Sequence, residues 1–140
     1  MQITRQADYA MRAVLYLAQL GSENRASTSQ IAEEQNIPAS FLAKIVSQLS
    51  VAGLLQTSRG ARGGVALARK PEEISLLEVV EAIDGPILLN ECVADNSTCA
   101  FGSDCRLRPV FCDAQAELVS TLESTTFGQV LHQNGNGKVA

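Results

Sequence analysis

Residues 27–50 read STSQIAEEQNIPASFLAKIVSQLS, and this stretch decides the fold of the chain. Ser27 followed three residues later by Gln30 has the form of a capping box, which predicts the start of a short helix. Pro38 disfavours helical geometry in the residue before it, so residues 34–38 are expected to form a turn. A second helix is expected to follow this turn at once.

This second helix has one apolar and one polar face. The side predicted to be buried comprises Phe41, Leu42, Ile45, Val46 and Leu49. The outward side comprises Ser40, Lys44, Ser47 and Gln48. Gly53 is expected to end the helix. A short helix, a tight turn and a helix whose free face is polar together predict a helix-turn-helix.

A longer helix is expected before this motif. Thr4 can cap it and Gly21 stops it. Its apolar stripe comprises Ala7, Ala10, Met11, Val14, Leu15 and Ala18. We expect Asp8 to lie on the polar side of this helix, away from Met11 and Leu15.

Two short strands are expected after the motif, at residues 54–57 and 65–68, joined by the segment SRGARGG at 58–64. Glycine lets the backbone turn sharply, and arginine suits phosphates and narrow minor grooves. A loose hairpin is the alternative, but its place directly after a helix-turn-helix favours a wing. The wing residues of interest are Arg59, Gly60, Arg62, Gly63 and Gly64.

The second half of the chain is expected to be helical on either side of a cysteine-containing loop. Ser75 with Glu78 has the form of a second capping box, and the helix that follows is closed by Gly85 and Pro86. A longer amphipathic helix runs from about residue 109 to about 124, with Val110, Phe111, Ala114, Leu118 and Leu122 apolar. Either a second copy of the chain or the rest of the monomer can bury this stripe.

The predicted fold is mainly α with a small β wing. The expected parts are a winged helix-turn-helix DNA-binding region at 1–70, a connecting helix at 71–91, a cysteine loop at 92–105, a dimerisation helix with a C-terminal turn at 106–132 and a disordered tail at 133–140.

Charge divides the chain in the same way. Residues 1–70 hold eight Lys and Arg against four Asp and Glu, a net charge of +4, whereas residues 71–140 hold three against eleven, a net charge of −8. The basic half is therefore where a polyanion would bind.

All four cysteines, Cys92, Cys99, Cys105 and Cys112, lie close together with the spacing C-x6-C-x5-C-x6-C. Soft thiolates select zinc, copper(I) or iron–sulfur clusters. Zinc sites usually carry C-x2-4-C pairs, which are missing here, and the ferredoxin spacings do not match either. The spacing alone does not decide among these metals.

The alternatives to a metal are disulfides and buried thiols. The chain begins MQITRQADYA without a leader peptide, and its apolar runs are too short for a membrane span. We therefore expect a cytoplasmic protein, in which clustered cysteines bind metal or react with oxidants more often than they form disulfides. The polar neighbours of these cysteines argue against a place in the core.

The order of these motifs resembles the Rrf2 family of bacterial transcription regulators. The resemblance rests on Thr4…Asp8-Tyr9-Ala10, on 40–45 SFLAKI, on 59–64 RGARGG and on three cysteines about thirty residues later. It implies a homodimeric winged-helix protein whose affinity for operator DNA changes with the state of an iron–sulfur cluster. It also implies that Cys92, Cys99 and Cys105 hold that cluster.

The resemblance is closer to the nitric-oxide-sensing repressors than to the iron–sulfur-biogenesis regulators, which have a histidine where this chain has Arg108. The former branch implies that Asp8 of the partner subunit is the fourth ligand of a [4Fe–4S] cluster, which we favour over [2Fe–2S]. Cys112 is the rival ligand. The expected signal is nitric oxide or a change in redox or iron status.

On DNA, Ser40 and Lys44 are expected to reach base edges and Arg59 to enter the minor groove. Thr4, Arg5 and Arg62 are expected to contact phosphates. The competing functions are an electron carrier or redox enzyme, which leaves the wing unused, and a DNA-binding protein with structural zinc. The chain has no nucleotide-binding glycine motif and no catalytic Ser/His arrangement, so we do not expect an enzyme.

Overall fold

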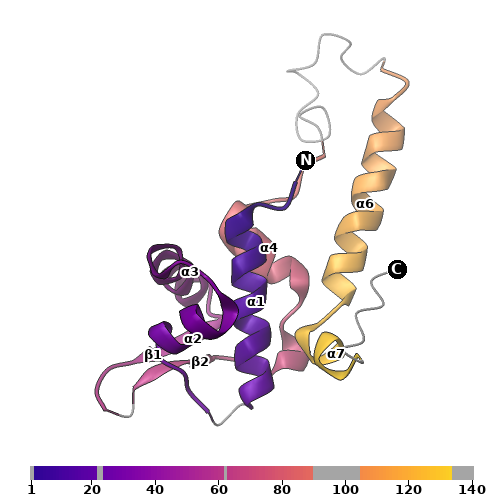
Figure 1. The fold of residues 1–140 in the computed structure, drawn as a ribbon. Coiled ribbons are helices and arrows are strands. Elements are labelled where there is room, and N and C mark those ends of the chain that lie inside the picture. The colour runs from indigo at the N-terminus through magenta and orange to yellow at the C-terminus, as the bar shows by residue number, and fades with distance from the viewer. Residues whose placement is uncertain (1, 22–23, 62, 90–104, 134–140) are drawn as a thin grey trace.

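The computed structural model describes residues 2–21, 24–61, 63–89 and 105–133. The elements follow in the order α1 (Arg5–Leu20), α2 (Thr28–Gln35), α3 (Ala39–Val51), β1 (Leu55–Ser58), β2 (Gly64–Leu67), η1 (Pro71–Glu73), α4 (Leu76–Asp84), α6 (Arg108–Ser124) and α7 (Phe127–His132). Helices α2 and α3 and the β1–β2 hairpin lie on one side of α1, and α6 stands on the other (Figure 1). The mainly helical fold with a small wing is confirmed.

Helix α1 forms as predicted. The Thr4 hydroxyl accepts a 3.1 Å hydrogen bond from the Ala7 N–H, so one free donor of the first turn is satisfied. Gly21 ends the helix with φ of 96°, a conformation that costs glycine little. The small side chains Ala7, Ala10 and Ala13 are buried, which lets α3 and α4 approach closely.

The turn between α2 and α3 depends on Asn36 rather than on Pro38 alone. Asn36 has φ of 53° and closes α2 in the left-handed conformation, which asparagine tolerates better than most residues. The Ser27 hydroxyl accepts from the Gln30 N–H at 3.0 Å, as in a capping box. The prediction of a full capping box is wrong, because the Gln30 side chain does not bond back to the Ser27 backbone N–H. Its amide donates instead to the Tyr16 hydroxyl at 3.1 Å.

The second predicted capping box is also only half formed. The Ser75 hydroxyl accepts from the Glu78 N–H at 3.1 Å and starts α4. The Glu78 carboxylate, however, pairs with Arg69 at 2.5 Å. Both side chains are more than a third exposed, and this pair joins the end of the hairpin segment to α4.

The hairpin is antiparallel and lies one residue away from the predicted limits at each strand. Strand β1 is Leu55–Ser58 and β2 is Gly64–Leu67, with Leu55 opposite Leu67 and Ser58 opposite Gly64. Leu54 is buried just before β1, and the Ala68 N–H donates to its carbonyl. This bond carries the hairpin contact one residue pair beyond the ladder, to Leu54 and Ala68.

One main core joins α1, α3, the hairpin and α4. Its largest fully buried side chains include Leu17, Ile31, Leu42, Ile45, Leu49, Leu54, Ile74 and Phe127. A smaller apolar group under α6 contains Leu77, Val80 and Ile87, against which Met11, Leu118, Val119 and Leu122 pack.

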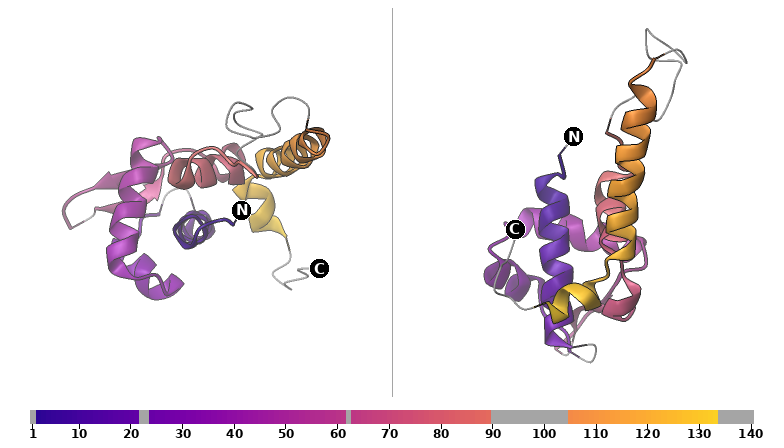
Figure 2. Two further views of the ribbon diagram at one scale, coloured as in Figure 1. Left: turned by 90° about the horizontal axis from the view of Figure 1, so that it is seen from above. Right: turned by 90° about the vertical axis from the view of Figure 1, so that its right-hand side faces the viewer.

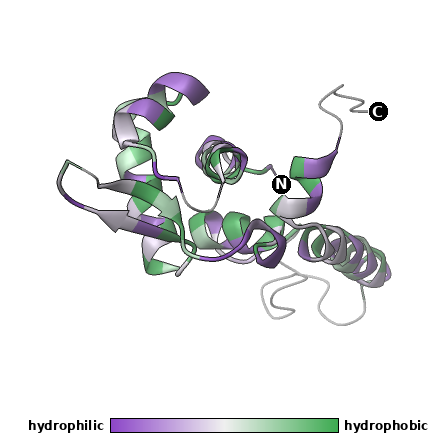
Figure 3. Ribbon diagram, turned by 90° about the horizontal axis from the view of Figure 1, so that it is seen from below, coloured by the Kyte–Doolittle hydropathy of each residue, from purple (hydrophilic) through white to green (hydrophobic). Residues whose placement is uncertain are grey.

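Helix α6 packs through its C-terminal half on the smaller apolar group, and Gln115 near its middle accepts from the Leu89 N–H at 2.9 Å. The helix rises alongside α1 and extends beyond it (Figures 1 and 2), and Figure 3 shows hydrophobic and hydrophilic segments along its length. None of its described side chains is buried, and Leu107 and Val110 near its start are 62% and 63% exposed. Packing within the monomer therefore covers one end of the predicted stripe and leaves the other open.

The predicted C-terminal turn is a helix, α7. The Thr126 hydroxyl accepts from the Gln129 N–H and the Gln129 side chain accepts from the Thr126 N–H, so a full capping box forms here. Phe127 is 1% exposed and packs in the main core. The short apolar run around it was too brief to show helical periodicity, which is why sequence reasoning read it as a turn.

Candidate nucleic-acid interface and metal-ligand residues

The outer face of α3 is the candidate reading surface. Ser40, Lys44 and Ser47 are exposed, while Leu42, Ile45 and Leu49 are buried against α1 and α4, so the helix presents a small, polar face. An α-helix with such a face fits the major groove of B-DNA. The predicted placement of Ser40 and Lys44 on the free face is therefore observed.

Phe41 departs from its predicted place. It is 40% exposed rather than buried, and its ring lies against that of Tyr9 in α1, with centroids 6.1 Å apart and tilted by 56°. Helical spacing explains the error, because residue 41 lies at the edge between the buried stripe of 42, 45 and 49 and the exposed stripe of 40, 44 and 47.

The wing glycines are favoured by positive φ angles at Gly60 and Gly64 and by close backbone approaches at Gly63 and Gly64. Gly60 and Gly64 have φ of 101° and 148°, and Gly63 donates to the Gly60 carbonyl at 2.9 Å. A Cβ at Gly63 would overlap the Ser58 carbonyl. Arg59 is exposed at the tip. Arg62, the second predicted wing arginine, lies outside the described residues.

A groove of about 280 Å³ separates the start of α2 from the hairpin. It is lined by the hydroxyl-bearing residues Ser27, Thr28, Thr57 and Ser58 and by the wing glycines. Arg25 lies beside it and donates from Nη1 to the Ser58 Oγ. Sequence reasoning missed Arg25, because it lies in a connecting segment with no motif around it.

Thr4 and Arg5 lie at the start of α1, at the opposite end of that helix from the wing (Figure 1). The Thr4 hydroxyl, besides capping α1, donates to the Asp84 carboxylate at 2.6 Å. Arg5 is exposed.

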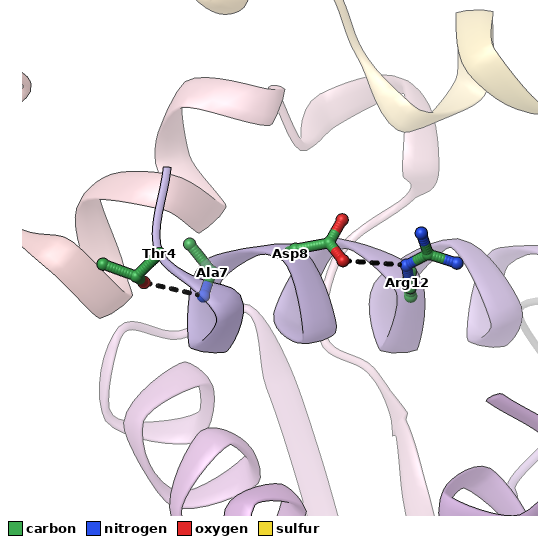
Figure 4. A network of polar contacts seen from close by, with 4 residues as sticks. All are labelled: Thr4, Ala7, Asp8 and Arg12. Carbon is green, nitrogen blue, oxygen red and sulfur yellow. Dashed lines mark hydrogen bonds and ion pairs between the residues drawn. The ribbon is translucent and has the colours of Figure 1, made fainter. Parts of the chain in front are cut away.

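Asp8, the predicted carboxylate ligand, is half exposed on α1 and forms a 3.0 Å ion pair with Arg12 one turn later (Figure 4). The prediction that Asp8 faces away from Met11 and Leu15 is wrong. Residues 8, 11 and 15 are spaced as i, i+3 and i+7 and share one side of the helix. Because Met11 packs against the apolar group under α6, Asp8 lies along the flank of α1 that leads towards α6.

Two of the four cysteines can be placed. Cys105 is half-buried just before α6, and Cys112 is half-buried in its second turn, and both thiols are free. Cys92 and Cys99 lie outside the described residues. Among the residues that are described, no three His, Cys, Asp or Glu side chains gather closely enough to hold a metal ion.

Within the described parts of the chain, no helix is both long and apolar enough to cross a membrane.

A short helix, a left-handed turn, an outward-facing polar helix and a glycine-rich basic hairpin define a winged helix-turn-helix protein of the DNA-binding class. The chain belongs to the Rrf2 family, whose model, described as an iron-dependent transcriptional regulator, matches residues 3–133.

Named relatives agree with this assignment. The chain is 36% identical over 127 residues to the HTH-type transcriptional regulator NsrR of Shouchella clausii, covering 90% of this chain and 85% of the relative. It is 35% identical over 132 residues to NsrR of Halalkalibacterium halodurans, covering 94% and 90%.

Solved structures share the fold. CymR, the global cysteine regulator of B. subtilis, superposes with a TM-score of 0.80 at 26% identity, over 94% of this chain and 96% of that one. T. potens IscR superposes with a TM-score of 0.76 at 24% identity, over 100% and 93%. The protein is a DNA-binding transcriptional regulator and not an enzyme, and the electron-carrier alternative is set aside.

Proposed function

We propose that this protein is a homodimeric repressor whose affinity for operator DNA is switched by a bound iron–sulfur cluster, in response to nitric oxide or to redox or iron status. The observation that carries the proposal is the place of Asp8. It is a half-exposed carboxylate on α1, the helix that packs directly against the reading helix α3. Whatever binds Asp8 therefore acts on an element in contact with the reading surface.

The residues proposed to hold the cluster are Cys92, Cys99 and Cys105, with Asp8 of the partner subunit as the fourth ligand. The donor chemistry fits, since thiolates are the usual ligands of iron–sulfur clusters. Cys105 is free and accessible just before α6, and Asp8 is not buried. When bound, the cluster would supply an iron centre that reacts with small oxidants or nitric oxide.

Asp8 is favoured over Cys112 as the fourth ligand. A carboxylate is a harder and more exchangeable ligand for iron than a thiolate, which suits a site that must react with a small molecule. Arg12 holds the Asp8 carboxylate at 3.0 Å in the single chain, so it is already oriented along the flank of α1. The rival ligand, Cys112, is half-buried in the second turn of α6. Four ligands can hold either a [2Fe–2S] or a [4Fe–4S] cluster. We favour [4Fe–4S] on the resemblance to the nitric-oxide-sensing branch.

The proposed dimer uses the open end of α6. Leu107 and Val110 at its start are exposed, whereas Leu118, Val119 and Leu122 further along pack on the smaller apolar group, so the described part of the chain leaves these two side chains largely uncovered. A second copy of this helix, related by twofold symmetry, would bury these side chains in both subunits. Two reading helices would then face successive turns of a pseudo-palindromic duplex.

On DNA, we propose that Ser40 and Lys44 reach base edges, that Arg59 enters the minor groove, and that Thr4, Arg5 and Arg62 contact phosphates. The glycines at 60, 63 and 64 allow the wing backbone to approach the duplex closely. The compartment proposed is the cytoplasm, where free thiols remain reduced.

The test is spectroscopic and functional on the same sample. Protein purified without oxygen should be coloured, and Mössbauer spectra of iron-57-labelled protein separate [4Fe–4S] from [2Fe–2S]. Binding to a preferred duplex should differ between the cluster-loaded and metal-free forms by the 5- to 150-fold typical of allosteric coupling, that is by about 1–3 kcal/mol. A colourless zinc protein that binds DNA equally well in both forms would overturn the proposal.

A further inference from the structure

The hairpin has a second partner besides its own strands. The Ala26 N–H donates to the Val65 carbonyl at 3.0 Å, and the Val65 N–H donates to the Ala26 carbonyl at 2.7 Å. Strand β2 therefore pairs with β1 on one edge and with the segment between α1 and α2 on the other. Two strands of four residues are marginal in water by themselves, so this third pairing helps to hold the wing on the helices.

Arg25, the residue before this pairing, reaches across β2 to β1. Its Nη1 donates to the Oγ of Ser58, which lies opposite Gly64 in the ladder. Gly64 leaves room for the crossing. A Cβ there would lie 2.8 Å from the Ala26 carbonyl oxygen and 3.4 Å from the Arg25 Cβ. The Arg25 side chain thus passes over Gly64, which has no side chain, to reach Ser58 on the neighbouring strand.

Ser58 is held from two directions just before the wing tip. Arg25 binds its hydroxyl, and the backbone of Gly63 lies against its carbonyl so closely that a Cβ at residue 63 would overlap it. The next residue is Arg59. The direction in which the tip leaves the sheet is therefore fixed largely by the position of Ser58.

We propose that Arg25 is a positioning residue for DNA recognition, which acts through Ser58 to set the angle at which the wing tip and Arg59 meet the minor groove. The inference rests on the proposed role of Arg59. It adds a residue outside the reading helix and the wing, in a connecting segment that neither the helix-turn-helix nor the hairpin includes.

The rival role for Arg25 is a direct phosphate contact, since its side chain is exposed beside the groove at the start of α2. The two roles differ in what lysine can replace. A phosphate contact needs mainly the positive charge, whereas the bond to Ser58 needs a donor at the position of the Arg25 Nη1, which the shorter lysine side chain does not supply. The two roles also differ in salt dependence. Each phosphate contact adds close to one to the slope of log affinity against log salt concentration.

The experiment compares Arg25→Ala, Arg25→Lys, Ser58→Ala, Arg59→Ala and the double variant Arg25→Ala with Arg59→Ala. All are tested in the full-length protein in one fixed cluster state, on a preferred and a random duplex, over a range of salt concentrations. Arg25→Ala, Arg25→Lys and Ser58→Ala should each weaken binding to the preferred duplex about 3- to 10-fold, as expected for one lost hydrogen bond. The affinity for the random duplex and the salt dependence of binding should change little. The double variant should be no weaker than Arg59→Ala alone.

Hydrogen exchange at the amides of residues 58–64 provides a readout without DNA, and it should be faster in Arg25→Ala and Ser58→Ala than in the parent protein. Unchanged exchange would overturn the bracing role regardless of what Arg59 does. Full rescue by Arg25→Lys, with a salt slope reduced by about one in Arg25→Ala, would assign Arg25 to a phosphate instead. Faster exchange with no effect of Arg59→Ala on DNA binding would refute the minor-groove role of the wing, and with it the specificity role of Arg25.

Discussion

The Oγ1 atom of Thr4 donates a 2.6 Å hydrogen bond to Oδ1 of Asp84, a residue eighty positions later in the chain. The same hydroxyl accepts from the Ala7 N–H and caps α1. The bond therefore fastens the start of α1 to the last residue of α4, where the chain leaves towards the cysteine loop. Both residues line a cleft with Ile3 and Leu88, two exposed apolar side chains.

Thr4→Val should remove the cap and the bond to Asp84 and lower the free energy of unfolding by about 1–2 kcal/mol. Thr4→Ser keeps the hydroxyl and is the matched control, with little change expected. Urea unfolding measures both. An unchanged free energy of unfolding in Thr4→Val would contradict the structural role, whatever the variant does to the phosphate contact proposed for Thr4.

Asp8→Ala and Cys112→Ala separate the two candidates for the fourth ligand. We expect Asp8→Ala to alter the cluster spectrum and to reduce the difference in DNA affinity between cluster-loaded and metal-free protein, because it removes a ligand from α1. Cys112→Ala should leave both unchanged. Cluster loss in Cys112→Ala, together with parent-like behaviour of Asp8→Ala, would contradict the proposal that Asp8 is the fourth ligand.

Arg12→Ala tests whether the ion pair on α1 orients Asp8. Arg12 and Asp8 are 60% and 48% exposed, so their pairing adds little to folding stability. The cluster should still assemble in this variant but should be lost faster on exposure to air, since the carboxylate is free to turn away. The decay of visible absorbance measures this. Arg12→Lys retains the charge and serves as the control, and equal decay in all three proteins would contradict the prediction.

Lys44→Ala should cost on the order of 1–3 kcal/mol on the preferred duplex and little on random DNA, because Lys44 is exposed on the reading face of α3. Fluorescence anisotropy on both duplexes gives the comparison. Lys70→Ala is a useful control, since Lys70 is also exposed but lies just before η1 rather than on the reading helix. An equal loss on both duplexes for Lys44→Ala would withdraw its base-reading role.

Val110→Glu should prevent the proposed dimer without unfolding the monomer, because Val110 is 63% exposed in the single chain. Placing a charge where two apolar stripes meet costs far more in a dimer than on a solvated helix. Sedimentation at micromolar concentration should show a dimer for the parent protein and a monomer for the variant. A variant that remained dimeric would move the interface away from the start of α6.

The sequence by itself determined the elements that depend on local patterns. Thr4, Ser27 and Ser75 start helices where predicted, because each supplies a side-chain acceptor to a free N–H three residues later. The polar face of α3 and the glycine-rich wing were also predictable, since both follow from the spacing of residues along one segment. The order of these parts was enough to indicate the family that the comparisons then showed.

Only the tertiary structure decided which partner each side chain takes. Phe41 lies against Tyr9 and Gln30 donates to Tyr16, because α1 packs beside α2 and α3. Glu78 pairs with Arg69, which comes from the segment after β2. The contact of Arg25 with Ser58 also depends on the tertiary structure. It forms because Ala26 pairs with Val65 of β2 and because Gly64 leaves space for the Arg25 side chain to cross that strand. Local spacing fixes where a side chain points from its own helix or strand, but contacts between distant segments depend on how those segments pack together.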